Sequence, residues 1–196
     1  MDTPSFFEPL SDLQPQGFAV ADDGPSKTLP LVMQGQDHPE WCWAANASSV
    51  SVFLGLGAGV SQCRIASICL DMDCCPPTPD EPPAWQGNTD WRIEPALTAA
   101  GNFAPPAQGR VGMGVVMSQI DAGLPICAHV HWDADQGHFV TICGYDASNR
   151  SSDVIVRDPL LPGDQHLPIE SFASDYRSGG TWDASYLTRK ADGLQE

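Results

Sequence analysis

The chain has 196 residues, which is enough for one domain with a substantial core, and its 42% hydrophobic content is typical of a globular protein. It carries 25 acidic against 9 basic side chains, a formal net charge of −16. This charge argues against a nucleic-acid partner, because phosphate backbones require a basic surface, and against docking on anionic membranes. No apolar run is long enough to span a bilayer.

The N-terminal residues 1–33 contain scattered hydrophobic residues without a sustained period. They are predicted to form an arm or pro-segment ahead of one folded domain over residues 34–190, with a short tail at 191–196. The first residues also lack the basic and apolar regions of a Sec signal peptide. We therefore expect synthesis in the cytoplasm, with any export following a route that needs no such signal.

Helical periodicity follows this arm. Trp43, Ala47, Val50 and Leu54 recur at spacings of four, three and four residues, which predicts one apolar helix face, and Gly55 supplies the stop. A loop rich in Pro and Asp is expected at 71–88, and three further helices are expected at 62–70, 89–101 and 115–122.

The C-terminal half changes to a period of two. Alternating runs rich in β-branched residues, divided by Gly, Asp, Ser and Asn, predict strands. We expect strands at 125–132, 137–146, 153–158 and 181–189, and a short helix at 169–176. Because helices come first and strands second, the predicted fold class is α+β, with an N-terminal helical lobe and a C-terminal antiparallel sheet lobe.

Cys42 stands at the start of the first predicted helix, between two tryptophans and shortly after Pro39. A helix N-terminus favours the thiolate, because backbone N–H groups and the positive end of the dipole lie near the sulfur. Cys42 is therefore a candidate nucleophile. Its backbone N–H and the side-chain amide of Gln36 are candidate donors to the oxyanion that attack on an amide creates.

A nucleophilic thiol needs a base, and five histidines are available, His38, His129, His131, His138 and His166. His138 is preferred because it opens a strand after a flexible turn, next to Gly137, where a substrate backbone could approach closely. His129 and His131 alternate on the preceding strand and share one face, where we interpret them as partly exposed or hydrogen-bonded histidines.

Asp158 ends the next predicted strand and can reach back across the paired strands to orient the imidazole of His138. Each residue alone has an ordinary structural explanation, as a core thiol, a loop histidine or a turn aspartate. Their joint order, with Cys on a helix, His opening a strand and Asp ending its neighbour, favours catalysis.

The sequence also resembles a known family. QDHPEWCWAA resembles the active-site segment of papain-like cysteine peptidases, GHFVTICGYD their histidine strand, and VIVRDP the strand of the third catalytic residue. SQC followed by DCC, ALTAAGNF and FASDYRSGGTWDASYLTR are similar to the short bacterial subset that includes staphopains and effector peptidases of plant pathogens. The resemblance runs from Gln34 to Arg189.

The resemblance implies a papain-like two-lobe fold, with Cys42 as nucleophile, His138 as general base and acid, Asp158 as its orienter and Gln36 as oxyanion donor. Gly137 and Trp43 are the candidate substrate-binding residues. Two departures from papain itself stand out. Asp158 takes the place of an asparagine, although the bacterial subset is similar here, and no tryptophan follows it closely to shield the hydrogen bond.

The remaining cysteines are interpreted structurally. A disulfide from Cys63 to Cys74 or Cys75 is simpler than a zinc site, because no matched pair of C-x-x-C knuckles is present. Cys127 and Cys143 lie in apolar strands and are expected in the core. Trp85 and Trp91 are expected to cover the core, and the spacing of the aspartates does not match a calcium loop. We expect no metal and no cofactor.

The predicted function is a monomeric cysteine endopeptidase acting on protein or peptide substrates. Two alternatives stay open from the sequence. The same groups could serve a deamidase or transglutaminase that acts on protein glutamine, or the fold could be retained in a binding module without catalysis. Self-removal of residues 1–33 is a separate hypothesis.

Overall fold

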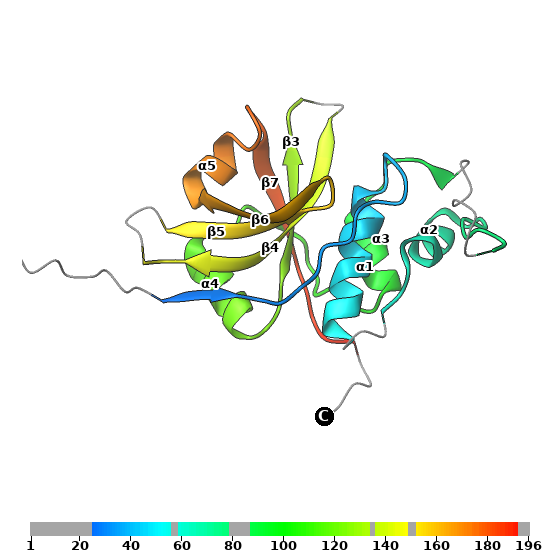
Figure 1. Cartoon of the computed structure of the whole chain (residues 1–196), viewed down its shortest axis with the longest axis horizontal. Helices are drawn as coiled ribbons and strands as arrows, with labels where there is room; N and C mark the ends of the chain where they lie inside the picture. The colour runs from blue at the N-terminus through cyan, green and yellow to red at the C-terminus, as the bar shows by residue number, and fades with distance from the viewer. Residues whose placement is uncertain (1–24, 56–58, 79–86, 134–135, 149–151, 192–196) are drawn as a thin grey trace, which may run out of the picture.

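Figure 1 shows a group of three helices standing beside an antiparallel β-sheet, with two more helices packed on the sheet. This computed structural model describes residues 25–55, 59–78, 87–133, 136–148 and 152–191. Helices predominate before residue 122 and strands after it, which confirms the predicted α+β class. None of the helices in these ranges is long and apolar enough to cross a membrane.

The helical lobe is built from α1 (Cys42–Leu54), α2 (Gln62–Leu70) and α3 (Ile93–Ala99). All three helices were predicted, and α1 is buried along most of its length because it lies between its neighbours and the sheet. Ser61 caps α2 by accepting the backbone N–H of Arg64 at 3.4 Å. A disulfide joins Cys63 to Cys75, one of the two predicted pairings.

The sheet lobe has the strand order β2-β7-β3-β4-β5-β6, with every pair antiparallel, and β1 pairs with β4. The predicted strands are β3 (Ile126–His131), β4 (Gly137–Asp146), β5 (Asp153–Asp158) and β7 (Thr181–Leu187). The unpredicted strands are β1 (Ser26–Thr28), β2 (Gln108–Gly109) and β6 (Leu161–Pro168).

The predicted domain start is too late. β1 pairs with the C-terminal half of β4, and Leu29 and Leu31 are buried in the core. Residues 26–33 therefore belong to the folded domain and not to a separate arm. Residues 1–24, which make up the rest of the predicted arm, lie outside the described residues, as do 192–196 of the predicted tail.

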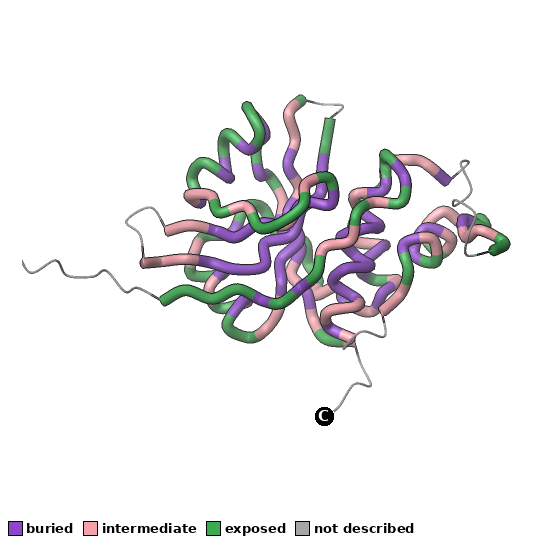
Figure 2. Tube along the Cα trace, viewed as in Figure 1, coloured by how far each residue is buried: buried purple, intermediate pink, exposed green. Residues whose placement is uncertain are grey.

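The core has two parts, one on each face of the sheet. Buried segments run along the central strands and along α1 (Figure 2). Alternate residues of the central strands face the helical lobe, among them Cys127, Phe139 and Cys143. The residues between them pack against α4 (Met113–Asp121) and α5 (Ile169–Ser174) on the other face. Burial of Cys127 and Cys143 confirms their prediction as core residues.

Candidate active site

A cleft of about 1550 Å³ lies between the helical lobe and the sheet lobe. The N-terminal end of α1 and the segment before α3 contribute one wall. The ends of β3 and β4, together with parts of β7 and the loop after β5, contribute the other. Cys42 and His138 both line this cleft, which places a thiol and an imidazole from opposite lobes in one solvent-accessible space.

Cys42 is the first residue of α1, and it is partly exposed at the cleft. The first N–H groups of a helix have no intrahelical partner, so the backbone here offers donors to a ligand. The sulfur therefore lies at the N-terminal end of α1, most of which is buried behind it.

His138 is buried and bonded on both sides. Its Nε2 lies 2.7 Å from Oδ1 of Asp158, and the ring also interacts with the side chain of Cys42. Burial alone would lower the pKa of His138, but the hydrogen bonds to Asp158 and Cys42 outweigh it and raise the pKa to about 9. The imidazole therefore favours its protonated form at neutral pH, held between the sulfur and the carboxylate.

Asp158 is fully buried, and it is stabilised there by several donors besides His138. The backbone N–H of Leu160 donates to Oδ1 at 2.8 Å, and the hydroxyl of Tyr176 donates to Oδ2 at 2.8 Å. Arg177 Nη1 lies 3.4 Å from the same oxygen. Burial would raise the pKa of Asp158, but the His138 bond and these donors hold it below its ordinary value.

The side chain of Asn46 forms hydrogen bonds with both lobes next to the site. Its Nδ2 donates to the carbonyl of Cys42 and to the carbonyl of Phe139, both at 2.8 Å, and its Oδ1 accepts from the hydroxyl of Thr141 at 2.6 Å. The side chain is fully buried. It thus connects the turn of α1 that carries Cys42 to the strand that carries His138.

The side chain of Gln36 does not reach the cleft that Cys42 and His138 line. Its Nε2 donates to the carbonyls of His38 and Pro39, and its Oε1 is buried without a hydrogen-bond partner. Both N–H bonds of the amide are thereby used, and the side chain is absent from the lining of the cleft. The predicted oxyanion role would therefore require this side chain to turn away from the two carbonyls.

The two predicted substrate-binding residues differ in position. Gly137 is exposed at the cleft, and a Cβ there would lie 2.5 Å from Nε2 of His129, so a larger residue would displace that ring. Trp43 is fully buried, and its indole N–H donates to the carbonyl of Thr89 at 3.0 Å. Trp43 therefore holds the wall of the cleft from beneath.

The prediction for Trp91 is wrong. Trp91 was expected to cover the core, but it is 40% exposed and lines the cleft. The hydrogen bond from Trp43 to Thr89 holds the adjoining chain so that the Trp91 side chain lies outside the core. Trp85, for which the same was expected, lies outside the described residues.

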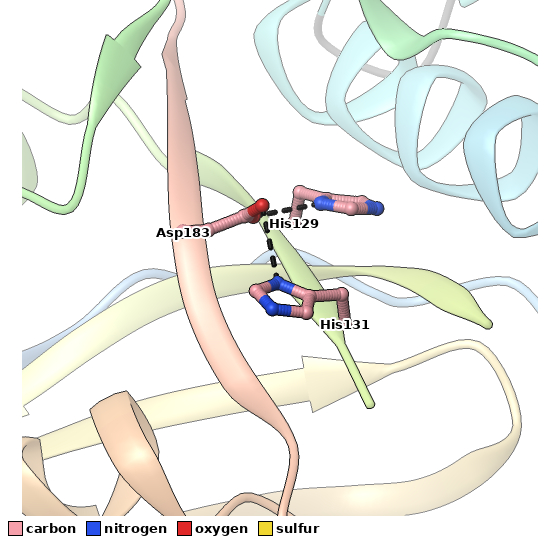
Figure 3. A group of neighbouring side chains, drawn as sticks. All are labelled: His129, His131 and Asp183. Carbon is pink, nitrogen blue, oxygen red and sulfur yellow. Dashed lines mark hydrogen bonds and ion pairs between the residues drawn. The ribbon is translucent and has the colours of Figure 1, made fainter. Parts of the chain in front are cut away.

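A second group of polar side chains lines the cleft on the sheet lobe. His129 and His131 project from β3 toward Asp183 on β7 (Figure 3). Nδ1 of His129 lies 2.7 Å from Oδ1 of Asp183, and Nδ1 of His131 lies 3.1 Å from Oδ2. The shared face of the two histidines was predicted, but their aspartate partner was not. These three side chains could hold a metal ion.

Three further residues of the site were not found from the sequence. Tyr176 and Arg177 belong to a segment quoted for its resemblance, and the only signal for Asn46 was a polar side chain inside an alanine-rich helix. Of the two remaining histidines, His38 is buried in the segment before α1 and His166 is exposed on β6.

The other free thiols differ from Cys42 in their surroundings. Burial raises the pKa of Cys127 and of Cys143 to about 12 and that of Cys69 to about 11, and it raises the pKa of Cys74 as well. None of these four lines the cleft. Because the thiolate is the reactive form, these side chains are expected to be poor nucleophiles at neutral pH.

Comparison with known proteins identifies a family and a similar fold. The sequence profile of the Peptidase_C39 like family matches residues 27–183. The fold is similar to the crystal structure of a protein from Bacillus anthracis described as a C39-like peptidase, with a TM-score of 0.53 and 15% sequence identity. The similarity covers 84% of this chain and 99% of that one, and at this identity it concerns the fold. No curated protein sequence matches the chain.

Proposed function

Because the chain belongs to the Peptidase_C39 like family of cysteine peptidases, we propose that it is an endopeptidase with Cys42 as nucleophile, His138 as acid and base, and Asp158 as orienting carboxylate. One observation carries this proposal: His138, whose imidazole lies 2.7 Å from the Asp158 carboxylate, lines the same cleft as Cys42 and interacts with its side chain. A thiol, a histidine and an oriented carboxylate in series are the groups that acyl transfer requires.

In the proposed reaction the Cys42 thiolate attacks the carbonyl carbon of a peptide bond and forms a C–S bond. The imidazolium of His138 gives its proton to the leaving amine as the C–N bond breaks, which leaves a thioester on Cys42. His138, now neutral, takes a proton from water, whose oxygen attacks the thioester. The carboxylic acid product leaves, and the thiolate–imidazolium pair is restored.

The oxyanion that forms during attack needs donors. We assign the backbone N–H of Cys42 to this role, because the first N–H groups of a helix have no intrahelical acceptor. Gln36 remains the proposed second donor, provided that substrate binding releases its amide from the carbonyls of His38 and Pro39.

The charge of the cleft suggests a class of substrate. Its lining includes two arginines but five acidic residues, Glu40, Asp90, Glu94, Asp133 and Asp183. A cleft with excess negative charge raises the local concentration of cationic peptides. We therefore expect cleavage to favour sites flanked by Lys or Arg, and this preference to weaken as ionic strength rises.

The test is digestion of denatured mixed proteins, read by mass spectrometry, with wild type, Cys42→Ala and the control Cys69→Ala. We expect new peptide termini with wild type and Cys69→Ala and none with Cys42→Ala. Conversion of glutamine to glutamate without cleavage would instead establish a deamidase, and glutamine-linked amines a transglutaminase. Alkylation of Cys42 no faster than that of a free cysteine would favour a binding module.

The narrower likeness to staphopains and plant-pathogen effectors, and export without a Sec signal, remain proposals. So does self-cleavage in the predicted arm of residues 1–33, which would fall before residue 26 because residues 26–33 belong to the folded domain. Intact mass under the conditions in which Cys42 is active tests the last of these. Loss of an N-terminal fragment from wild type but not from Cys42→Ala is expected, and a full-length active enzyme would contradict it.

A further inference from the structure

The geometry of His129, His131 and Asp183 points to a use beyond hydrogen bonding. Each oxygen of the Asp183 carboxylate faces a different imidazole, and each imidazole presents its Nδ1 atom. The two rings are nearly parallel, with an angle of 22° between them and 6.4 Å between their centres. Three nitrogen and oxygen ligand atoms, one from each side chain, lie within 4.8 Å of one another.

A β-bulge in β7 brings the carboxylate to this face. His129 pairs with Ala184 and Val130 pairs with Trp182, so Asp183 is the extra residue of the bulge. Trp182 is buried on the far side of the sheet, while Asp183 is exposed on the cleft side. Bulges commonly redirect a side chain beside a functional site, and here the redirected group is a carboxylate aimed at two histidines.

Hydrogen bonding alone leaves one of the imidazoles poorly satisfied. Nδ1 of His131 is buried and makes no hydrogen bond of good geometry, although it is 3.1 Å from the carboxylate. A buried polar atom in this state calls for a partner. A cation between the three side chains would accept the lone pairs of both Nδ1 atoms and of one carboxylate oxygen.

We propose that His129, His131 and Asp183 bind a divalent first-row transition metal ion, with Zn²⁺ as the most suitable species. Two imidazoles and one carboxylate are a ligand set that zinc accepts in proteins, with a fourth position left for water or a substrate group. Ca²⁺ and Mg²⁺, which prefer oxygen ligands, are poorly matched to a set that contains two imidazoles. The site is independent of the chemistry proposed for Cys42.

The distances allow an ion to enter once the side chains move. Tetrahedral bonds of about 2.0–2.1 Å place neighbouring ligand atoms roughly 3.3 Å apart. The separations of 2.7 and 3.1 Å between Asp183 and the two imidazoles therefore need to widen, and the widest separation among the three ligand atoms, at most 4.8 Å, needs to shorten toward the same value. Asp183 can provide the widening, because its side chain is 43% exposed and no backbone neighbour holds its carboxylate in the described part of the chain.

The experiment is a titration of the full-length Cys42→Ala protein with Co²⁺ followed by displacement with Zn²⁺, without added thiols. Removal of the Cys42 sulfur prevents metal capture by the pair with His138. We expect one equivalent of Co²⁺ to give the visible bands of a tetrahedral ion without a thiolate charge-transfer band, and Zn²⁺ to abolish them. Isothermal titration with Zn²⁺ then gives the affinity.

Three variants in the same background test the ligands. Asp183→Asn and His131→Gln should each weaken Zn²⁺ binding at least about tenfold, and His129→Gln combined with His131→Gln should abolish it. His166→Gln removes an exposed histidine from β6 and should leave binding unchanged. Absence of one-equivalent binding in Cys42→Ala would overturn the proposal, and so would binding that Asp183→Asn and the folded double variant both retain.

Discussion

Two histidine–aspartate pairs each contribute a histidine to the same cleft, with the same nitrogen–oxygen distance of 2.7 Å and different surroundings. In the pair of His138 and Asp158 the two side chains are 8% and 0% exposed. In the pair of His129 and Asp183 they are 25% and 43% exposed. Distance alone therefore does not distinguish a catalytic pair from any other.

The difference lies in what else each carboxylate touches. Asp158 accepts from a backbone N–H, a tyrosine hydroxyl and an arginine besides His138, so its charge is retained although it is buried. A buried charge held in this way raises the pKa of His138. Asp183 instead divides its two oxygens between two imidazoles and faces solvent. One carboxylate orients a single ring, and the other brings two rings to one point.

Removal of each histidine gives the largest expected contrast. His138→Gln removes the proton donor and acceptor and should lower kcat/KM by at least about 10³-fold. His129→Gln leaves Cys42, His138 and Asp158 in place and should change kcat/KM by less than about tenfold. Steady-state cleavage of a peptide identified by the digestion supplies the measurement. Comparable losses for both variants would contradict the division of roles.

The next contrast changes each carboxylate to its amide. Asp158→Asn keeps an acceptor for His138 but removes the negative charge, and should lower kcat on the order of 10²-fold. It should also shift the alkaline limb of the profile of kcat/KM against pH to lower pH. The limb reports loss of the His138 proton near pH 9 in wild type, and the missing charge lowers that pKa.

Asp183→Asn is the matched control and should leave the alkaline limb in place.

The stability of the fold should also depend on the protonation of His138. The pKa of His138 is raised from 6.5 to about 9 on folding, so this contribution is complete below pH 6.5 and disappears as pH rises through about 9. The unfolding temperature of wild type should therefore fall relative to that of Asp158→Asn across this range. Equal shifts in the two amide variants would show that the charge of Asp158 is not the cause.

The strands that the sequence did not reveal have physical reasons in common. β6 contains Pro162, Gly163, Asp164 and Pro168, which are typical of a loop. It forms because it lies at the edge of the sheet, where a residue without an N–H is tolerated and pairing with β5 supplies the order. β1 and β2 are too short for any period to be read. Strands β3, β4, β5 and β7 and the five helices of the described residues were predictable because their burial imposes a pattern.

The site was predictable where local sequence determines position. Cys42 opens a helix and His138 opens a strand, so both could be placed before any contact was known. Tyr176 could not be placed, because its contact with Asp158 depends on how α5 and the following turn pack against the sheet. Asp183 faces its histidines because of a β-bulge, and a bulge cannot be predicted from the spacing of residues in one strand.

Asn46 allows a test of how the buried pair is aligned with Cys42. Asn46→Ala leaves two carbonyls and the Thr141 hydroxyl without their partner, and should lower the free energy of unfolding by about 2–4 kcal/mol. It should also lower kcat about tenfold, because α1 is then free to shift against β4. Denaturant unfolding and peptide kinetics give the two values.

Asn102→Ala is the control for this change. Asn102 is also buried, and its Nδ2 donates to the carbonyl of Arg189 at 3.0 Å, away from the cleft. Its loss should lower stability by about 1–2 kcal/mol with little effect on kcat. If both variants lower kcat in proportion to stability, Asn46 has no positioning role.

The smallest expected effect concerns the support of Asp158. Tyr176→Phe removes the hydroxyl that donates to Oδ2 but keeps the ring, which packs edge-on against Phe172 at 5.4 Å between centres. With one donor fewer, the pKa of Asp158 should rise and kcat should fall about three- to tenfold. Tyr145→Phe removes a like bond to Asp121 outside the cleft and should leave kcat unchanged. A Tyr176→Phe enzyme with wild-type kcat and an unchanged pH profile would mean that Leu160 and Arg177 suffice to keep Asp158 charged. The contrast between the two carboxylates would then rest on burial and not on the number of donors.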